Sequence, residues 1–569
     1  LRDAITNQTG PRTIVFSISG IIDLQSRLTL TDDYVTVAGQ TAPGRGITIA
    51  SAPFGVTGND CVVQNIRVRL GGGPTFDGMG LTGADHSIID HCSISWTIDE
   101  AFSSRGAHNI TLQRTLISEA LNAAGHQNYP PKTEHGYAAS IGGDIGSFHH
   151  NLLAHNYGRN WSLAGGLDGS GAYAGRLDIT NNVVYNWGAR TTDGGAHEVN
   201  FVNNYYKPGA GSTRFFALVA ENEGAGTGTQ QYFFDGNVMP GRFDETNQTS
   251  GRIKTGVPVT FDNFVDSAFF PSYVTTQTAN HAYKIVLSDV GCNQPAFDYH
   301  DERMIAETLA GTYSVVGSVT GKKGFPDDEA DAGGYENYPV LTRDADWDSD
   351  SDGLPDWYET VIGTDLNSPA EDFSDTNADL DLDGYTNMDD YLQWMDQPNF
   401  STVSGAPLTI NLQKLSRGFT NDVSYTVSNV ENGTYTLAGE IIEFTPTALG
   451  IGSFDFTVTD SVGDSMTRTV NILNGYDLGT LSVENSLASK VKVWPVPNDG
   501  SFFIEVESPR LKSGFKVFDM LGKEVVSGFV ESGETKEVRL PSHARGLFFV
   551  QVMDRDSKKV IHWQKVVVR

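Results

Sequence analysis

The sequence contains few cysteines, few basic residues and no long apolar run. Three cysteines in 569 residues cannot form a disulfide framework, so Cys61, Cys92 and Cys292 are expected to be buried free thiols. Lys and Arg total 39 against 70 Asp and Glu, a net charge of −31, which excludes general nucleic-acid binding because that needs a basic surface. No stretch of about 20 apolar residues is present, so no transmembrane helix is expected.

The residues that are abundant favour β structure. Glycine is frequent at 62 residues, and charged residues make up only 19% of the chain. The apolar runs are short and rich in Val, Ile, Phe and Tyr, without helical heptads, which is typical of an all-β protein. A chain of this length is too long for one core, so several domains are expected.

Similar short segments recur through the first half of the chain, about 22 to 36 residues apart. They are 62–66, 87–91, 110–114, 148–151, 177–182, 199–204 and 232–237. This spacing predicts the coils of a parallel β-helix, in which each coil buries its inward residues against its neighbours. The Asn residues at the repeated turn predict a ladder of side-chain amides. Long loops at 118–147 and 160–175 are the expected place for binding residues.

The composition changes along the chain predict five parts. Residues 1–340 form the β-helix domain, with coils that continue to about residue 335, and residues 341–398 form a calcium-repeat module. Alternating apolar and polar residues over 399–475 predict an Ig-like or cadherin-like β-sandwich. A linker at 476–489 leads to a last β domain over 490–569.

Two acidic loops have the spacing of EF-hand-type calcium sites, with oxygen ligands at positions 1, 3, 5, 9 and 12 and Gly at position 6. The first offers Asp348, Asp350, Asp352, Asp356 and Glu359, and the second offers Asp379, Asp381, Asp383, Asn387 and Asp390. Asp390 replaces the usual Glu and reaches less far, so the second loop is expected to bind more weakly. The pair resembles thrombospondin type 3 and dockerin-like repeats. This resemblance implies a calcium-stiffened spacer in an extracellular protein.

Motifs in the β-helix region resemble the pectate lyase family, polysaccharide lyase family 1. They are Asp77-Gly-Met, Ile89-Asp90-His91-Cys92, Asn156-Tyr-Gly-Arg159 and Asn181-Asn182-Val-Val-Tyr185, and the resemblance covers about residues 1–335. It implies a right-handed parallel β-helix. It also implies β-elimination of a polyuronate, with pectate or polygalacturonate as the substrate and unsaturated oligosaccharides as products.

The resemblance assigns roles to three basic residues. Arg159 matches the catalytic base and also contacts substrate. Lys132 matches a substrate-binding Lys that assists catalysis, and Arg105 matches a substrate-binding basic residue beside the metal site. An Arg pKa normally exceeds about 12, so a base at position 159 requires a desolvated and cationic surrounding.

The resemblance also places a calcium ion in the cleft. Asp77 and Asp99 match two ligand positions, Glu100 is their neighbour, and Ser103 falls where the family has a third carboxylate. Whether catalysis needs calcium therefore stays open at this point. The Asp90–His91 pair is expected to be buried and structural. The histidines at 149, 150 and 155 are expected to face outward or stack rather than bind zinc.

The C-terminal residues resemble the sorting domain of type IX secretion. The motifs are Lys492-Val-Trp-Pro495-Val-Pro497-Asn498, Val517-Phe-Asp519-Met-Leu-Gly522 and Lys565-Val-Val-Val-Arg569. The resemblance implies that the secretion machinery is a partner and that the protein is secreted or attached to the outer surface. A secretory signal is expected upstream of Leu1. We expect a monomer with an acidic polysaccharide as its substrate.

Two other functions are considered. A polygalacturonase-like glycoside hydrolase would need an acid and a base carboxylate at a set separation. Asp99 and Glu100 are adjacent, and adjacent side chains on a strand point to opposite faces, which argues against that pair. A non-catalytic carbohydrate-binding or adhesive β-helix is the other alternative, and the Arg159 and Lys132 loops argue against it.

Overall fold

The computed structural model describes residues 1–403, 405–478, 490–494, 500–507, 513–519, 523–530, 535–541, 544–554 and 560–568. The chain divides into two compact units, Leu1–Pro407 with Asn411–Ser482, and Leu408–Ile410 with Val483–Arg569. Each unit is described by itself.

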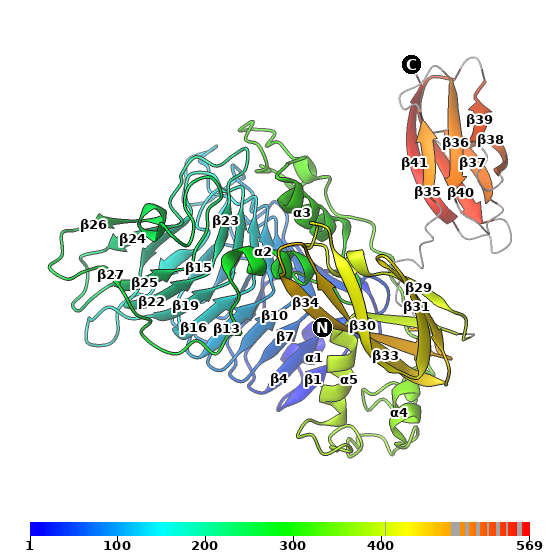
Figure 1. The fold of residues 1–569 in the computed structure, drawn as a ribbon, viewed down its shortest axis with the longest axis horizontal. Helices are drawn as coiled ribbons and strands as arrows, with labels where there is room; N and C mark the ends of the chain where they lie inside the picture. The colour runs from blue at the N-terminus through cyan, green and yellow to red at the C-terminus, as the bar shows by residue number, and fades with distance from the viewer. Residues whose placement is uncertain are drawn as a thin grey trace. The chain divides into compact units, whose positions relative to one another are not determined.

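Three parallel sheets form the predicted β-helix, and each coil contributes a strand to each sheet in turn (Figure 1). Sheet 1 contains β1 (Arg12–Ile14), β4 (Val35–Ala38), β7 (Val62–Gln64), β10 (Ile88–Asp90), β13 (Ile110–Gln113), β16 (Asp144–His149), β19 (Arg176–Thr180), β22 (Glu198–Val202), β25 (Gln231–Asp235) and β27 (Phe264–Val265). Sheet 2 contains β2 (Gly20–Asp23), β5 (Ile47–Ala50), β8 (Ile66–Arg69), β11 (Ser93–Ser95), β14 (Leu116–Ser118), β17 (Leu152–Ala154), β20 (Val183–Tyr185) and β23 (Tyr205–Lys207). Sheet 3 contains β3 (Leu28–Leu30), β6 (Phe54–Val56), β9 (Met79–Gly80), β12 (Phe102–Ser103), β15 (Ala139–Ile141), β18 (Ser162–Ala164), β21 (Thr192–Gly195), β24 (Leu218–Asn222) and β26 (Arg252–Gly256).

Inward side chains stack along the axis and fix the register of the coils. In sheet 1, Leu112 pairs with Phe148, Phe148 with Ile179, and Ile179 with Phe201, and all four are fully buried. A slip of one residue would turn this apolar row outward, so the register is strongly specified. The recurring segments found in the sequence are the strands of sheet 1, as predicted.

The predicted asparagine ladder is present at the turn between sheets 1 and 2. The Nδ2 group of Asn151 donates to Oδ1 of Asn182 at 2.9 Å, Asn182 donates to Asn204 at 3.0 Å, and Asn204 donates to Asn237 at 3.0 Å. All four side chains are buried. Each amide thus satisfies the next one inside the stack, where an unpaired polar group would cost free energy.

The coils end earlier than predicted. The last strand in the parallel ladder is β27, which ends at Val265, so the expectation of coils to about residue 335 is wrong. Two helices follow, α2 (Ala279–Ser288) and α3 (Tyr299–Ala310), and their apolar faces cover the outer side of sheet 2. Thr278 and Asp298 cap their N-termini, a local signal of helix that the search for strands missed. The only helix before the coils in the described chain is the short α1 (Arg2–Thr6).

Buried ion pairs join α3 to sheet 2. Arg69 on β8 contacts Asp298 at 2.9 Å and Asp301 at 2.7 Å, and these side chains are at most 1% exposed. Asp298 also caps α3 and accepts a hydrogen bond from Tyr338 at 2.6 Å. Because the charges are paired, arginine side chains can be buried between the outer face of sheet 2 and α3.

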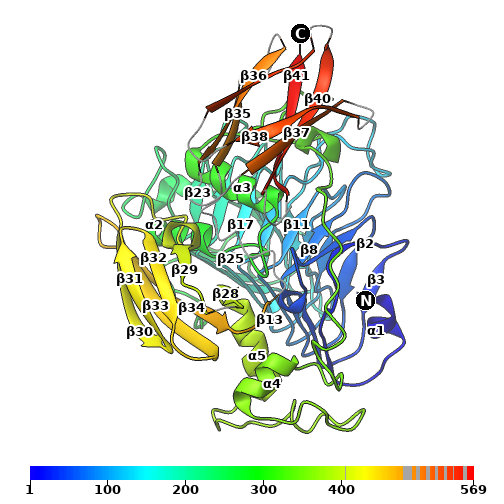
Figure 2. The ribbon, with the colours of Figure 1, turned by 90° about the vertical axis from the view of Figure 1, so that its right-hand side faces the viewer.

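Residues 341–398 carry two helices, each after an acidic loop. They are α4 (Asp356–Ile362) and α5 (Asn387–Asp396), and Figures 1 and 2 both place them beside β33. The next strands are β28 (Asn399–Thr402), β29 (Leu408–Asn411), β30 (Ser424–Glu431), β31 (Gly433–Ala438), β32 (Ile441–Pro446), β33 (Gly450–Thr459) and β34 (Ser465–Asn474). The order β28-β34-β33-β30 forms one sheet, and β31 pairs with β32, which gives the predicted sandwich.

The second unit contains two antiparallel sheets over a shared apolar core. Their strands are β35 (Lys490–Trp494), β36 (Ser501–Glu507) and β39 (Thr535–Arg539), and β38 (Glu524–Val530), β37 (Ser513–Asp519), β40 (Gly546–Asp554) and β41 (Val560–Val568). Phe502, Val517 and Val550 are fully buried between them. The predicted linker from residue 479 to 489, and the motif residues 495–499 and 520–522, lie outside the described residues.

The three cysteines are buried and free. Within the described part of the chain, no helix has the length and apolar character needed to cross a membrane.

We predict that Asp298→Ala lowers the free energy of unfolding by about 3–5 kcal/mol, because the buried Arg67 loses its carboxylate partner and the buried Arg69 keeps only Asp301. Chemical denaturation followed by tryptophan fluorescence would measure this. Asp32→Ala is the matched control, because Asp32 pairs with Arg12 at 2.9 Å but keeps 32% of its side chain exposed. The control should cost at most about 1 kcal/mol. Equal losses in both variants would contradict the role of the buried pair.

A second prediction concerns His91, whose Nδ1 lies 2.8 Å from Asp90 in a buried pair. Burial alone would lower the pKa of His91, but the charges of Asp90 and Asp289 outweigh it and raise the pKa to about 10. The imidazolium therefore stabilises the fold fully below the unfolded pKa of about 6.5, and this contribution disappears as pH rises through 10.

His91→Asn should therefore reduce the unfolding free energy more at pH 6 than at pH 10, in denaturant titrations at both values. Asn suits the left-handed backbone at this position, where φ is 46°. The control is His86→Asn, which has the same backbone conformation but a 61% exposed side chain. A loss for His91→Asn that does not depend on pH would show that the imidazolium charge is unimportant.

Candidate active site

Charged and aromatic side chains line up in the turns that lead into sheet 3. Asp77, Glu100 and Tyr137 each precede a strand by two residues, in three successive coils. Arg159 and Arg190 occupy the corresponding turns of the next two coils. Because neighbouring strands lie about 4.8 Å apart, these turns form a continuous row of side chains along the helix axis. We refer to these five residues as the turn row.

Three carboxylates meet at one end of the turn row. One oxygen each of Asp77, Asp99 and Glu100 lies within 4.8 Å of the others. The expectation that Asp99 and Glu100 face opposite sides is wrong, because the chain bends at residues 98 and 99 and β12 begins only at Phe102. Strand alternation therefore does not apply here, and both carboxylates reach the same place.

The donor set of this cluster fits a hard divalent cation. Burial and the charge of Asp77 raise the pKa of Asp99, while Arg159 and Arg105 act in the opposite direction. Ser103, at the position of the third family carboxylate, donates a hydrogen bond to Asp77 at 2.7 Å, so Glu100 is the third carboxylate instead. Converging carboxylate oxygens are the ligands that calcium prefers.

Two arginines contact the buried Glu100. Nη2 of Arg105 lies 3.3 Å from Oε1 of Glu100 and 3.0 Å from Oγ of Ser140, and its side chain is 59% exposed. Arg159 forms an ion pair with the same oxygen of Glu100. Ser140 also donates to this oxygen at 2.6 Å. The site thus presents cations beside a carboxylate cluster, within a strongly acidic protein.

The surroundings of Arg159 lower its pKa. Burial is the largest cause and the neighbouring Arg190 cation adds to it, while Asp99 and other carboxylates act in the opposite direction. The guanidinium lies 4.0 Å above the ring of Tyr137, and a pair of 2.6 Å hydrogen bonds from Arg190 to Asp193 holds Arg190 in place. The ion pair with Glu100 acts in the opposite direction to burial, because it favours the protonated guanidinium.

The loop that carries Lys132 is anchored at the same end of sheet 3. His126 lies 3.4 Å from Asp99, and Glu134 accepts a hydrogen bond from Tyr157 at 2.6 Å. Lys132 lies between these anchors and is exposed, but no described contact joins it to the carboxylates or to Arg159. Its predicted role therefore stays a prediction.

A cavity of about 310 Å³ continues from the carboxylate cluster along sheet 3. Asp77, Ser103, Arg27 and Phe54 are among the residues that line it. The cavity therefore shares Asp77 with the carboxylate cluster and adds a further cation, Arg27, to the surroundings of the site.

Close carboxylates argue against a glycoside hydrolase of the inverting type. An inverting hydrolase needs its two carboxyl groups about 6.5–9.5 Å apart to admit a water molecule. Here the three oxygens converge within 4.8 Å, and two arginines contact Glu100. This arrangement is typical of a cation site rather than of an acid and base pair.

The two acidic loops in the module at 341–398 also gather their carboxylates. Asp348, Asp350 and Asp352 lie within 4.8 Å of one another, and so do the first three ligands of the second loop, Asp379, Asp381 and Asp383. Gly353 and Gly384 have φ of 99° and 101°, the left-handed turn that position 6 requires.

Glu359, at position 12 of the first loop, is oriented for the same cluster. Its side chain is fully buried, its Oε2 has no hydrogen-bond partner among described residues, and burial with Asp350 and Asp352 raises its pKa to about 8. A cation would relieve each of these features, so the residues fit calcium. The position 9 residues instead brace their loops, since Asp356 accepts from Ser349 at 2.7 Å and Asn387 donates to Asp375 at 2.7 Å.

Sequence reasoning missed Tyr137, Ser140 and Arg190. Arg190 follows Arg159 by 31 residues, a distance within the range of one coil, and each stands in the turn before a strand of sheet 3. Aligning residues by their place in the coil would therefore have found Arg190. Tyr137 and Ser140 lie within the range 118–147 that was predicted as a long loop, so their place in the coil could not be read from the spacing.

Comparisons with known proteins agree with this organisation. The model of the secretion system C-terminal sorting domain matches residues 492–569, and that of the bacterial Ig domain matches residues 393–473. A probable pectate lyase C from Aspergillus flavus is 30% identical over 401 residues, which cover 68% of this chain and 84% of the relative. A probable pectate lyase C from Aspergillus terreus is 31% identical over 404 residues, with the same coverage.

Similar solved structures include Jun a 1, the major allergen from cedar pollen, with a TM-score of 0.38 and 13% identity over 51% of this chain and 83% of that chain. A pectate lyase from Paenibacillus sp. 0602 gives a TM-score of 0.32 and 11% identity over 50% of this chain and 78% of that chain.

We predict that Glu359→Gln lowers the calcium affinity of the first loop by at least about tenfold, because it removes the charge of the position 12 ligand. Isothermal titration of the full chain with calcium would measure it. Glu371→Gln, an exposed Glu between the two loops, is the matched control and should leave the affinity unchanged. Wild-type affinity in Glu359→Gln would exclude this residue as a ligand.

Proposed function

Because this chain belongs to the pectate lyase family, we propose that it cleaves polygalacturonate at the turn row of sheet 3 by β-elimination. The protein is a polysaccharide lyase. The observation that carries the proposal is Arg159, which is partly buried, lies beside a second arginine and borders three converging carboxylates.

β-Elimination sets two demands on the site. A base removes the proton on the carbon next to the uronate carboxylate, the electron pair forms a carbon–carbon double bond, and the glycosidic oxygen leaves from the next carbon. The proton is weakly acidic because the carboxylate is already negative. Cations at that carboxylate lower the barrier, because they stabilise the additional charge that develops in the transition state.

Arg159 is the proposed base. Burial and the Arg190 cation lower its pKa, which is the direction that a neutral guanidine requires. Tyr137 packs against the guanidinium and limits its orientations, and burial keeps the Tyr137 phenol neutral by raising its pKa to about 12. In this proposal, Arg159 releases a proton to solvent when the pair with Glu100 opens, and the neutral guanidine then accepts the substrate proton on the nitrogen that gave it up.

Substrate carboxylates would be bound by the exposed cations around the cluster. Arg105 reaches past Ser140 into solvent, and we assign Lys132 to the same task from its place in the covering loop. Asp77, Asp99 and Glu100 would hold calcium, which when bound supplies positive charge to a uronate carboxylate. These cations favour an unesterified polyuronate over a methyl-esterified one.

The protein acts outside the cell or at its surface, as the sorting domain at residues 492–569 indicates. We propose that the loops at 348–359 and 379–390 bind calcium there and stiffen the connection between the β-helix and the Ig-like domain. Glu359 supports this proposal, because its buried carboxylate lacks a cationic partner among the described residues.

The experiment that tests the function is ultraviolet absorbance of the unsaturated uronate product. Polygalacturonate should give a rise in absorbance that chelator abolishes and calcium restores, and methyl-esterified pectin should give a slower rise. A rise that chelator does not affect would remove calcium from catalysis but keep the lyase. No rise with either polymer would contradict the proposed substrate.

We predict that Arg105→Gln and Lys132→Gln each raise KM for polygalacturonate by about threefold to fivefold, because each removes an exposed charge contact. Their kcat should change less, since neither is the base. Lys254→Gln is the matched control, an exposed cation on β26 at the far end of sheet 3. An unchanged KM in Lys132→Gln would remove that residue from the binding site.

A further inference from the structure

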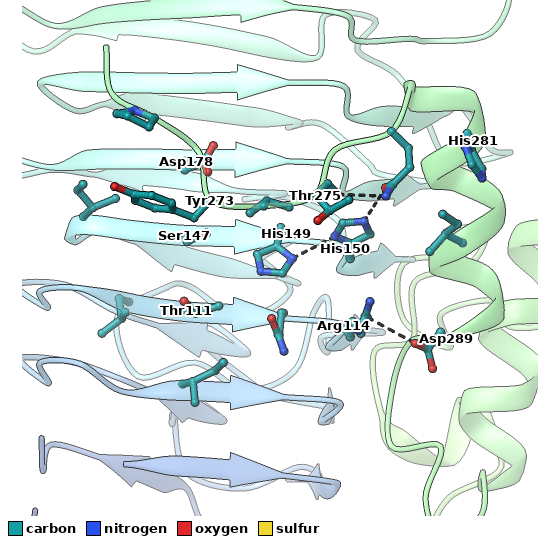
Figure 3. Close-up of a pocket in the computed structure, with 18 of the residues that line it drawn as sticks. Thr111, Arg114, Ser147, His149, His150, Asp178, Tyr273, Thr275, His281 and Asp289 are labelled. Carbon is teal, nitrogen blue, oxygen red and sulfur yellow. Dashed lines mark hydrogen bonds and ion pairs between the residues drawn. The ribbon is translucent and has the colours of Figure 1, made fainter. Parts of the chain in front are cut away.

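A second groove lies on sheet 1, whereas the turn row belongs to sheet 3. It has a volume of about 820 Å³ and is bounded by β13, β16 and β19, by the segment 270–277, and by residues 465–468 of the Ig-like domain. Figure 3 shows His149, His150 and Ser147 on the strands beneath it, with Tyr273 on the segment that crosses them. None of the residues of the turn row lines this groove.

A chain of hydrogen bonds fixes the protonation of the two histidines (Figure 3). Nε2 of His150 lies 2.8 Å from Oε1 of Gln277, which can only accept, so this nitrogen carries the proton. Nδ1 of His150 must then accept from Nδ1 of His149, 3.0 Å away. Burial lowers the pKa of His149 to about 3 and that of His150 to about 4, so both are neutral. His149 Nε2 is left as an acceptor.

Arg114 is a cation in the groove whose hydrogen-bonding capacity is not fully used by the described residues. Its Nε lies 3.5 Å from Asp289, and this buried nitrogen has no hydrogen-bond partner among the described residues. Asp289 is already engaged by Arg468 at 2.7 Å. The side chain of Arg114 is 34% exposed, so an incoming anion can reach its guanidinium.

The two carboxylates that line the groove, Asp178 and Asp289, already have hydrogen-bond or ion-pair partners. Asp178 accepts hydrogen bonds from Thr180 at 2.7 Å and from Ser272 at 2.6 Å, and burial raises its pKa. Asp289, the other carboxylate, faces arginines. An anionic ligand would therefore meet Arg114 without an uncompensated carboxylate beside it, although the protein as a whole carries a charge of −31.

An exposed aromatic ring lies next to hydroxyl groups. Tyr273 is 95% exposed, the highest value among the large hydrophobic side chains that the structure describes. Thr111 and Ser147 pair across β13 and β16, and both side chains line the groove. An aromatic face with adjacent donors and acceptors matches a sugar ring, which has an apolar face and a rim of hydroxyl groups.

We propose that this groove is a second carbohydrate-binding site, specific for an acidic oligosaccharide. Tyr273 stacks on one sugar ring, His149 Nε2 accepts from a hydroxyl, and Arg114 binds a uronate carboxylate. The choice of uronate rests on the proposed function. A polymer bound here stays attached to the enzyme while the turn row acts on another segment or chain, which raises activity on long substrates by effective concentration.

The test is isothermal titration of trigalacturonate into the full chain that carries Arg159→Ala, so that the ligand is not cleaved. Two binding sites per chain are expected. Tyr273→Ala and Arg114→Gln in this background should each weaken one site by about fivefold or more and leave the other unchanged. Tyr299→Ala, which removes a 63% exposed tyrosine on α3, is the matched control and should keep both sites.

Tyr273→Ala is the more specific of the two variants, because Arg114→Gln also removes the contact between Arg114 and Asp289. Equal thermal unfolding of both variants would show that neither change acts through stability. Maltotriose, which lacks carboxylates, should not bind at the second site. Maltotriose binding there with the affinity of trigalacturonate would overturn the acidic specificity, and a single trigalacturonate site in the background protein would overturn the inference.

Wild-type turnover of polygalacturonate, measured in parallel, separates this inference from the proposed function. Unsaturated products together with only one binding site would contradict the second site and keep the lyase on this substrate. No turnover together with a site lost in Tyr273→Ala would contradict the proposed substrate and keep the second site.

Discussion

The register of the parallel coils is the constraint on which the rest of the structure depends. Stacked apolar rows such as Leu112, Phe148 and Ile179 fix each coil against the next, and the asparagine ladder satisfies the amides of the turn. Side chains far apart in sequence thereby arrive at the same place in successive coils. A slip of one residue in any coil would remove its contribution from both the core and the turn row.

The register also explains the electrostatics of the site. It places Glu100 within reach of Arg159 and places Arg190 one coil further on, so that partly buried cations and converging carboxylates are held together. Neither the arginines nor the carboxylates would be stable alone at a site that is partly shielded from solvent. A polyanionic substrate complements the arginines of this arrangement, and a divalent cation complements its carboxylates.

Repetition made most of the fold predictable, because every coil repeats the same turn and the same inward pattern. Asp77, Asp99 and Glu100 were found from motif order, and they do converge. The bend at residues 98 and 99 could not be read from strand alternation, since it depends on how the turn closes against neighbouring coils. Arg190 belongs to none of the motifs that were recognised in the sequence. The helices α2 and α3 follow the last coil, in a region that was searched only for strands.

The most direct test of the central claim is the initial rate at which Arg159→Lys and Arg159→Ala form unsaturated uronate from polygalacturonate. If Arg159 is the base, turnover falls by about 10²–10⁴-fold in both variants, while the unfolding transition stays that of the wild type. Arg159→Lys is the sharper variant, because it keeps a positive charge at the site. Turnover near the wild-type value in that variant would contradict the assignment and leave Arg159 as a contact for the substrate carboxylate.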